Sequence, residues 1–191
     1  MMSSIKFNLW LKLSLKKVTL KINEIYPKSQ LGFKLTNICD FSIWVEKKGI
    51  HSLLLDVDGT LVNRKSNMIP KAVKNWIIES KKLFSIYLIS NNPSKKRIAK
   101  IAKELNLGYK YNASKPRKKV TLSAIKEIGR EPKNIAIIGD RIFTDIIVGN
   151  RCNIKTILVK RLNRDGLPIK FNLTLIVEKL ISNFIKWKLG S

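Results

Sequence analysis

The chain has 191 residues, a formal net charge of +25 at pH 7 and a hydrophobic fraction of 45%. This length and apolar content predict one folded domain with modest extensions and argue against wholesale disorder. Two widely separated cysteines and a single histidine exclude a Cys/His zinc site, and no apolar run reaches the roughly 18–20 residues of a transmembrane helix.

The positive charge has two explanations, and the sequence leaves both open. With 38 Lys and Arg against 13 Asp and Glu, the chain suits an anionic partner: nucleic acid, an anionic membrane surface or a phosphorylated substrate. Lys, Ile and Asn are also the residues that AT-rich codons supply, so codon bias in a plastid or a reduced bacterium explains part of the same charge. The cysteine usage fits a reducing intracellular compartment.

Residues 1–35 form a basic N-terminal segment in which lysines are interleaved with apolar side chains and no acid precedes Glu24. Two interpretations fit this pattern. One is a basic amphipathic helix that lies on an anionic membrane, and the other, which we favour, is an arm packed on the body of the protein. The segment lacks an unbroken hydrophobic region, so it is a poor secretory signal. We expect the folded domain to span residues 36–191.

From residue 36 onward, helical and strand patterns alternate. Strands with buried apolar runs are predicted at 52–56, 85–90, 135–139 and 155–160. Helices are predicted at 36–48, 70–83, 93–105, 117–128, 143–149 and 172–188. The inward-facing residues of the 70–83 helix include Leu83. Apolar strands separated by helical patterns predict an α/β fold with a parallel sheet flanked by helices.

Polar residues follow the predicted strands where each strand ends. Asp56 and Asp58 come after the first strand, Ser90 and Asn91 after the second, and Asp140 and Asp145 after the third; Lys115 precedes a helix. In an open α/β sheet, ligands bind beyond the carboxyl ends of the strands, so we expect these side chains to converge there.

The chemistry of these residue types points to phosphoryl transfer. A carboxylate with a pKa near about 3.9, such as Asp56, is ionised at neutral pH and needs no activating base to attack phosphorus. A Mg²⁺ ion between carboxylates offsets the repulsion from phosphate, and Asp140 is the natural second carboxylate. Asp58 can protonate the leaving oxygen and then deprotonate the attacking water. Gly59 allows backbone N–H groups to approach the phosphate.

In order along the chain, Asp56-Val57-Asp58-Gly59-Thr60, Ser90, Lys115 and Gly139-Asp140…Asp145 resemble the four motifs of the haloacid dehalogenase (HAD) superfamily. The resemblance implies an α/β, HAD-like (Rossmann-like) fold and a Mg²⁺-dependent phosphatase with an aspartyl-phosphate intermediate. It implies that Asp56 is the nucleophile and Asp58 the acid/base, and that Asp56, Asp58 and Asp140 form the metal site. Ser90, Asn91 and Lys115 are then substrate-binding residues, and Gly59, Thr60 and Asp145 are supporting residues.

A narrower resemblance rests on Ser90-Asn91-Asn92, on Ala113-Ser114-Lys115-Pro116 and on the segment 139–151. These are similar to the class IIIA branch that includes phosphatidylglycerophosphate phosphatases of mitochondria, plastids and bacteria. That branch usually has Asn at the position of Gly59 and Gln at the position of Arg141. Only 27 residues separate Val62 from Ser90 and 24 separate Ser90 from Lys115, so we expect no cap domain.

The sequence therefore predicts a capless HAD-type phosphatase that converts phosphatidylglycerophosphate to phosphatidylglycerol at an anionic membrane. Two alternatives stay open. One is a soluble phosphatase that acts on a small metabolite or on a nucleic-acid end, and the other is a non-enzymatic, RNA-associated basic protein that retains the fold. The intact set of Asp56, Asp58, Lys115 and Asp140 argues against the second alternative.

Overall fold

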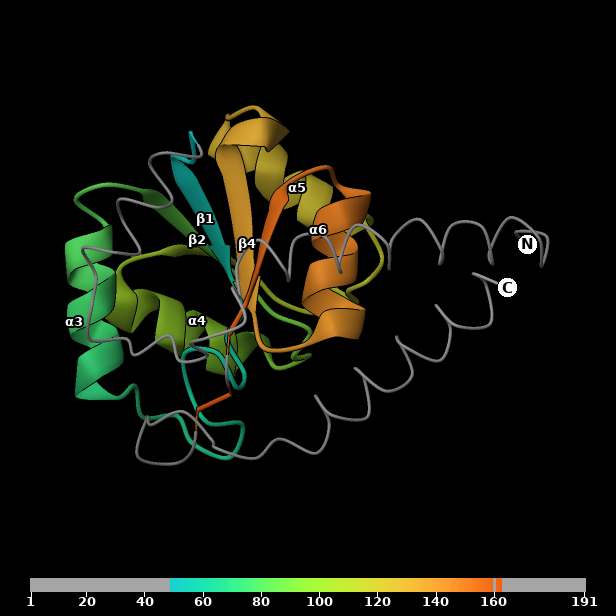
Figure 1. Cartoon of the computed structure of the whole chain (residues 1–191). Helices are drawn as coiled ribbons and strands as arrows, with labels where there is room; N and C mark the ends of the chain where they lie inside the picture. Colours follow the sequence, from blue (N-terminus) through green and yellow to red (C-terminus); the bar gives the residue numbers. More distant parts are fainter. Residues whose placement is uncertain (1–48, 160, 163–191) are drawn as a thin grey trace, which may run out of the picture.

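A computed structural model describes residues 49–159 and 161–162 (Figure 1). Five parallel strands form one sheet in the order β3-β2-β1-β4-β5. The strands are β1 (Ser52–Leu55), β2 (Ser85–Ile89), β3 (Gly108–Lys110), β4 (Ile135–Gly139) and β5 (Lys155–Leu158). The helices are α3 (Lys71–Ser80), α4 (Lys95–Leu105), α5 (Lys119–Ile128) and α6 (Ile147–Arg151), with short turns η1 (Pro132–Asn134) and η2 (Ile142–Ile146). The predicted parallel α/β architecture is confirmed.

The central strands are buried on both faces, which explains their uninterrupted apolar sequences. Side chains of a strand point alternately to opposite faces of the sheet. Leu53 and Leu55 accordingly pack in the cluster formed with α3 and α4, and Leu54 packs in the cluster formed with α5 and α6. These helix pairs cover the two faces of the sheet (Figure 1). β1 pairs with β2 on one side and with β4 on the other, so its carboxyl end lies at the middle of the sheet.

Local sequence signals set the helix ends. The Ser94 hydroxyl accepts a hydrogen bond from the backbone N–H of Arg97 at 3.3 Å, so α4 begins one residue after Ser94 rather than at 93. α5 ends at Gly129, whose φ of +69° is the left-handed conformation that glycine adopts readily. α3 ends at Ser80 rather than at 83, and Leu83 is 57% exposed, so the prediction that Leu83 faces the core is wrong.

Two further elements differ from the sequence prediction. β3 was not predicted because it has only three residues and lies at the sheet edge, where half-buried residues leave no apolar run. The helix predicted at 143–149 is a π-helical turn, η2, that continues into α6 and ends at Arg151. Such turns are frequent at functional sites. β5 is shorter than predicted and ends at Leu158.

The sheet edge that carries the predicted site is open. Between β1 and β4, residues 56–134 hold only α3, β2, α4, β3, α5, η1 and the loops between them, which matches the predicted capless architecture. Within the part of the chain that the structure covers, no helix has the length and apolar character needed to cross a membrane. The predicted basic segment 1–35 and the helices at 36–48 and 172–188 lie outside the described residues, so the division at residue 36 stays a prediction.

Candidate active site

Three buried aspartates converge beyond the carboxyl ends of β1 and β4. Asp56 directly follows β1, and its backbone N–H donates to the Ile138 carbonyl of β4 at 2.9 Å. Asp140 directly follows β4, and Asp145 lies on η2. Carboxylate oxygens of these three residues lie within 4.8 Å of one another. Segments separated by more than 80 positions in the sequence thus form one acidic cluster, because β1 and β4 are neighbours.

Lys115 binds two of the three aspartates of this acidic cluster and is itself buried. Its Nζ donates to Oδ1 of Asp56 at 2.7 Å, to Oδ1 of Asp145 at 2.6 Å and to the Ile89 carbonyl at 3.1 Å. Burial lowers the pKa of Lys115, but the neighbouring Asp145 and Asp56 outweigh it and raise the pKa above its usual value. The ammonium group therefore stays charged and offsets the charge of both aspartates.

The Asn91 side chain holds Lys115 in place through the backbone. Its Oδ1 accepts from the Lys115 N–H at 2.7 Å, and its Nδ2 donates to the Lys115 carbonyl at 2.9 Å. Both polar atoms of the amide are used in this way. Asn91, predicted to bind substrate, lines the pocket, and its amide group holds the backbone at Lys115.

Asp56 occupies an unusual electrostatic environment for a carboxylate. Burial raises its pKa to about 6, Lys115 acts in the opposite direction and Asp145 adds to the rise. The ordinary carboxylate pKa of about 3.9, expected from the sequence, therefore does not hold for Asp56 in the folded site. Thr60, predicted as a supporting residue, donates its hydroxyl to Oδ2 of Asp56 at 3.1 Å. The two oxygens of Asp56 thus have separate partners.

Asp140 provides the best evidence for a cation site. Its Oδ2 accepts from Nε of Arg161 at 2.6 Å, whereas its Oδ1 is buried and has no hydrogen-bond partner among the described residues. Burial raises the pKa of Asp140, the nearby Asp56 adds to the rise, and Arg161 opposes it. An unsatisfied buried carboxylate oxygen next to Asp56 fits a divalent cation, and carboxylate oxygens are the ligands that Mg²⁺ prefers.

Both carboxylate oxygens of Asp145, the remaining member of the acidic cluster, accept hydrogen bonds from other groups of the protein. Its Oδ1 accepts from Lys115, and its Oδ2 accepts from the Arg141 N–H and the Thr144 hydroxyl, both at 3.2 Å. A side chain at Gly139 would place Cβ 2.3 Å from Cγ of Asp145, so the glycine makes room for the aspartate. Asp145, predicted to be a supporting residue, is thus a partner of Lys115.

The acidic cluster differs from the predicted metal set in one member. Asp145 takes the third position, and the Asp58 carboxyl group does not belong to the cluster. The Asp58 carboxylate instead accepts from Arg97 Nη2 at 2.5 Å and from Asn92 Nδ2 at 2.8 Å. Asp58 still lines the pocket, close to Asp56 in the chain. The Arg97 contact joins residues 39 positions apart, which no local sequence signal reveals.

Gly59 lies in the tight turn that follows Asp58. Its backbone N–H donates to the Val62 carbonyl at 2.7 Å within the turn, so this group is not available to a phosphate. Its φ is +99°, and a Cβ would lie 2.7 Å from Oδ2 of Asp140. The glycine is therefore required for the turn conformation and for the close approach of the Asp140 carboxylate.

A pocket of about 280 Å³ opens above Asp56. Ser90, predicted to bind phosphate, lines it and accepts the Asn92 N–H at its Oγ at 3.1 Å, which leaves the hydroxyl hydrogen to donate. Sequence reasoning did not single out Arg64, which also lines the pocket. The sequence signal that could have identified Arg64 is its position six residues after Asp58. The full lining is Asp56, Asp58, Arg64, Ser90, Asn91, Asn92, Lys115, Arg141 and Thr144.

Comparisons of the sequence find one family model and a similar bacterial protein. A family model described as HAD-hydrolase-like matches residues 112–180. The "Probable phosphatase YqeG" of Bacillus subtilis (strain 168) is 29% identical over 147 residues, which cover 75% of this chain and 83% of that protein.

Solved structures include similar folds. The crystal structure of an uncharacterized protein from Listeria monocytogenes serotype 4b has a TM-score of 0.50 at 17% identity, and the match covers 66% of this chain and 86% of that one. The cobalt-bound deoxy-D-mannose-octulosonate 8-phosphate phosphatase of Haemophilus influenzae has a TM-score of 0.48 at 13% identity, with 75% of this chain and 91% of that chain covered. At the identity of the Listeria protein, the likeness concerns the fold alone.

Proposed function

We propose that this chain is a phosphatase of the HAD superfamily that transfers the phosphoryl group of a monoester to Asp56 and then to water. The observation that carries the proposal is the position of Asp56. Its carboxylate lies at an open pocket, held by Lys115 and Thr60, beside a second carboxylate that has an unsatisfied oxygen.

The proposed reaction has two steps. In the first, a carboxylate oxygen of Asp56 forms a bond to phosphorus while the ester P–O bond breaks, and Asp58 gives its proton to the leaving oxygen. In the second, Asp58 takes a proton from water, whose oxygen attacks phosphorus and releases Asp56. The Ser90 hydroxyl would donate to a phosphate oxygen, and the Lys115 ammonium, whose three N–H groups bind protein acceptors, offsets negative charge beside Asp56.

Mg²⁺ is the cofactor that we propose for this reaction. Asp56 and Asp140 would hold it, because their oxygens converge and one Asp140 oxygen lacks a partner among the residues of the structure. A bound Mg²⁺ supplies positive charge that offsets the repulsion between a carboxylate and phosphate. The pocket leaves room for water ligands, which Mg²⁺ usually keeps.

Hydrolysis of p-nitrophenyl phosphate tests the activity. We expect the parent protein to be active with Mg²⁺, and we expect EDTA or Asp56→Asn to reduce its activity to background. The matched control is Glu131→Gln, which changes an exposed carboxylate to an amide away from the pocket. Equal activity of Asp56→Asn and the parent would exclude Asp56 as the nucleophile.

For the substrate, we propose phosphatidylglycerophosphate, which carries a terminal phosphomonoester and a second, bridging phosphate. Two observations support this choice. Arg64 and Arg141 line the pocket beside Lys115, and their cationic side chains suit a second anionic group. α4, which follows the pocket residue Asn92, exposes four lysines that suit an anionic lipid surface, Lys95, Lys96, Lys100 and Lys103.

A substrate screen separates the lipid from the soluble alternatives. Phosphatidylglycerophosphate in vesicles that contain phosphatidylglycerol is compared with glycerol 3-phosphate, a sugar phosphate and a 3′-phosphorylated oligonucleotide. We expect the highest kcat/KM on the lipid, with loss of vesicle binding at high salt. A higher kcat/KM on a soluble ester would refute the lipid substrate and favour the metabolite, or the nucleic-acid end if the oligonucleotide is preferred.

A further inference from the structure

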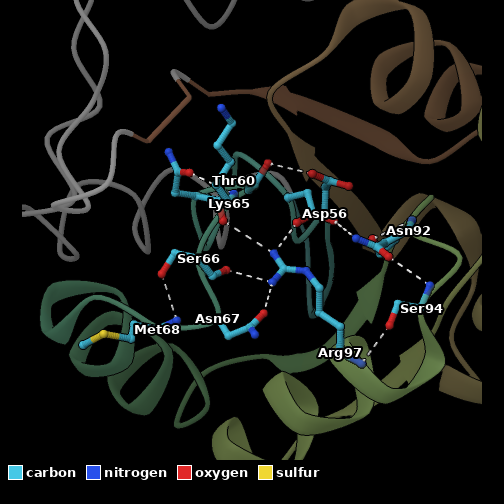
Figure 2. Close-up of polar contacts among 12 residues, drawn as sticks. Asp56, Thr60, Lys65, Ser66, Asn67, Met68, Asn92, Ser94 and Arg97 are labelled. Carbon is cyan, nitrogen blue, oxygen red and sulfur yellow. Dashed lines mark hydrogen bonds and ion pairs between the residues drawn. The ribbon is translucent and has the colours of Figure 1, made fainter.

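One arginine on α4 makes four polar contacts with the segment that follows Asp56. The Arg97 guanidinium donates to Oδ1 of Asp58 at 2.5 Å, to the Ser66 carbonyl at 2.8 Å and to the Asn63 carbonyl at 3.5 Å. It also donates to Oδ1 of Asn67. Figure 2 shows the Arg97 side chain reaching from α4 to Ser66 and Asn67. The side chains of Arg97 and Asp58 are each only 14% exposed, so this ion pair is shielded from solvent.

The other oxygen of Asp58 is held from the same side. Asn92 donates its Nδ2 to Oδ2 of Asp58 at 2.8 Å and accepts the Ser94 N–H at its Oδ1 at 2.9 Å. Ser94 in turn caps α4 through the Arg97 N–H. The start of α4 therefore forms a connected chain of hydrogen bonds that contacts both oxygens of the Asp58 carboxylate.

We infer that Arg97 is a positioning residue for the proposed reaction: it fixes the Asp58 carboxyl group at the pocket and ties residues 63–67 to α4. The inference rests on the proposed function, in which Asp58 transfers the proton. Proton transfer requires a carboxyl group within hydrogen-bond reach of the leaving oxygen. A turn residue with a freely rotating side chain satisfies that condition only part of the time, and small misplacements reduce rates strongly.

The chemistry of the guanidinium group explains why arginine occupies this position. Its planar fork presents five donors, and here it binds one carboxylate and three amide oxygens at once. A lysine ammonium is a single point charge and cannot span these acceptors. The same contacts hold the segment that carries Arg64, so Arg97 also positions one cation of the pocket lining.

The test uses two esters that differ in their need for a proton donor. Glycerol 3-phosphate releases an alkoxide that needs a proton, whereas p-nitrophenyl phosphate releases a stable phenolate. kcat/KM reports the steps up to formation of the aspartyl-phosphate. We expect Arg97→Met to lower kcat/KM on glycerol 3-phosphate about 100-fold, the lower end of a general acid's contribution, and to change it by less than about threefold on p-nitrophenyl phosphate.

Further variants keep the test decisive. Asp58→Asn should show the same selectivity, and the double variant Asp58→Asn/Arg97→Met should lose no more than Asp58→Asn alone, because Arg97 acts through Asp58. Arg97→Lys keeps the charge and the helix, and should show the same selective loss if Arg97→Met does not fold. Arg130→Met, an exposed arginine outside the pocket, is the matched control with parental activity.

The outcomes separate the inference from the function on which it rests. Equal losses on both esters, or an unchanged ratio of the two kcat/KM values, would overturn the positioning role of Arg97 while leaving the phosphatase intact. A folded parent protein that hydrolyses neither ester would refute the proposed function itself. A selective loss on glycerol 3-phosphate that is not additive with Asp58→Asn supports the inference.

Discussion

Removal of the buried ammonium group should destabilise the protein strongly. Lys115 Nζ lies 2.7 Å from an Asp56 oxygen and 2.6 Å from an Asp145 oxygen. At an effective dielectric constant of about 20, each attraction amounts to about 6 kcal/mol before the desolvation of the three charges is counted. Removing one partner of a buried ion pair typically costs about 3–5 kcal/mol. We therefore expect Lys115→Met to lower the free energy of unfolding by about 3–5 kcal/mol at pH 8.

The destabilisation should depend on pH. Burial raises the pKa of Asp56 and the Lys115 ammonium group lowers it. Without the ammonium group, the pKa of Asp56 therefore rises further in the folded state. An acid with a raised folded-state pKa contributes most stability below its unfolded pKa, and this contribution is lost as the pH rises. The cost of Lys115→Met should therefore be smaller at pH 5 than at pH 8. Adding Asp145→Asn removes the neighbouring carboxylate and should restore part of the stability.

Urea unfolding in EDTA at pH 5 and pH 8, followed by circular dichroism, measures these values. Lys126→Met is the matched control, because Lys126 is exposed on α5, and it should change stability by less than about 0.5 kcal/mol. A cost for Lys115→Met below about 1 kcal/mol, or one that is equal at both pH values, would refute the argument that Lys115 compensates buried carboxylates.

Three further predictions concern single positions. In urea titrations with EDTA, Asp56→Asn should be more stable than the parent protein by about 3 kcal/mol at pH 7, because burial raises the pKa of Asp56 from 3.8 to about 6. At pH 5 the difference in stability should be roughly half as large. A difference that grows toward low pH would contradict this sign. Gly59→Ala should lower Mg²⁺-dependent hydrolysis and reduce the stability measured in a thermal melt by about 1–3 kcal/mol, because φ is +99° and the added Cβ would meet Asp140. Activity equal to that of the parent protein would contradict this prediction. Ser94→Ala should cost about 1 kcal/mol by loss of the α4 cap, and an unchanged melting temperature would argue against that bond.

The elements that sequence reasoning placed correctly are those with strong local signals. The buried runs at β1 and β4 are continuous and apolar, and both end at aspartates, so the strands and the site at their carboxyl ends were predictable. Helix ends with a cap residue, such as Gly129, were predicted closely. β3 and the π-helical form of η2 were not predicted, because three residues at a sheet edge and one widened turn leave no period in the sequence.

The sequence by itself determined which residue types occur in the site and which strands they follow, because apolar runs and the order of acidic motifs are properties of the chain. Only the tertiary structure decided how these residues are paired: Lys115 between Asp56 and Asp145, Asn91 on the lysine loop, and Asp58 with Arg97. These contacts join residues 24 to 59 positions apart. Such contacts, and the burial that raises the pKa of Asp56, arise from packing and therefore have no periodic or compositional signal along the chain.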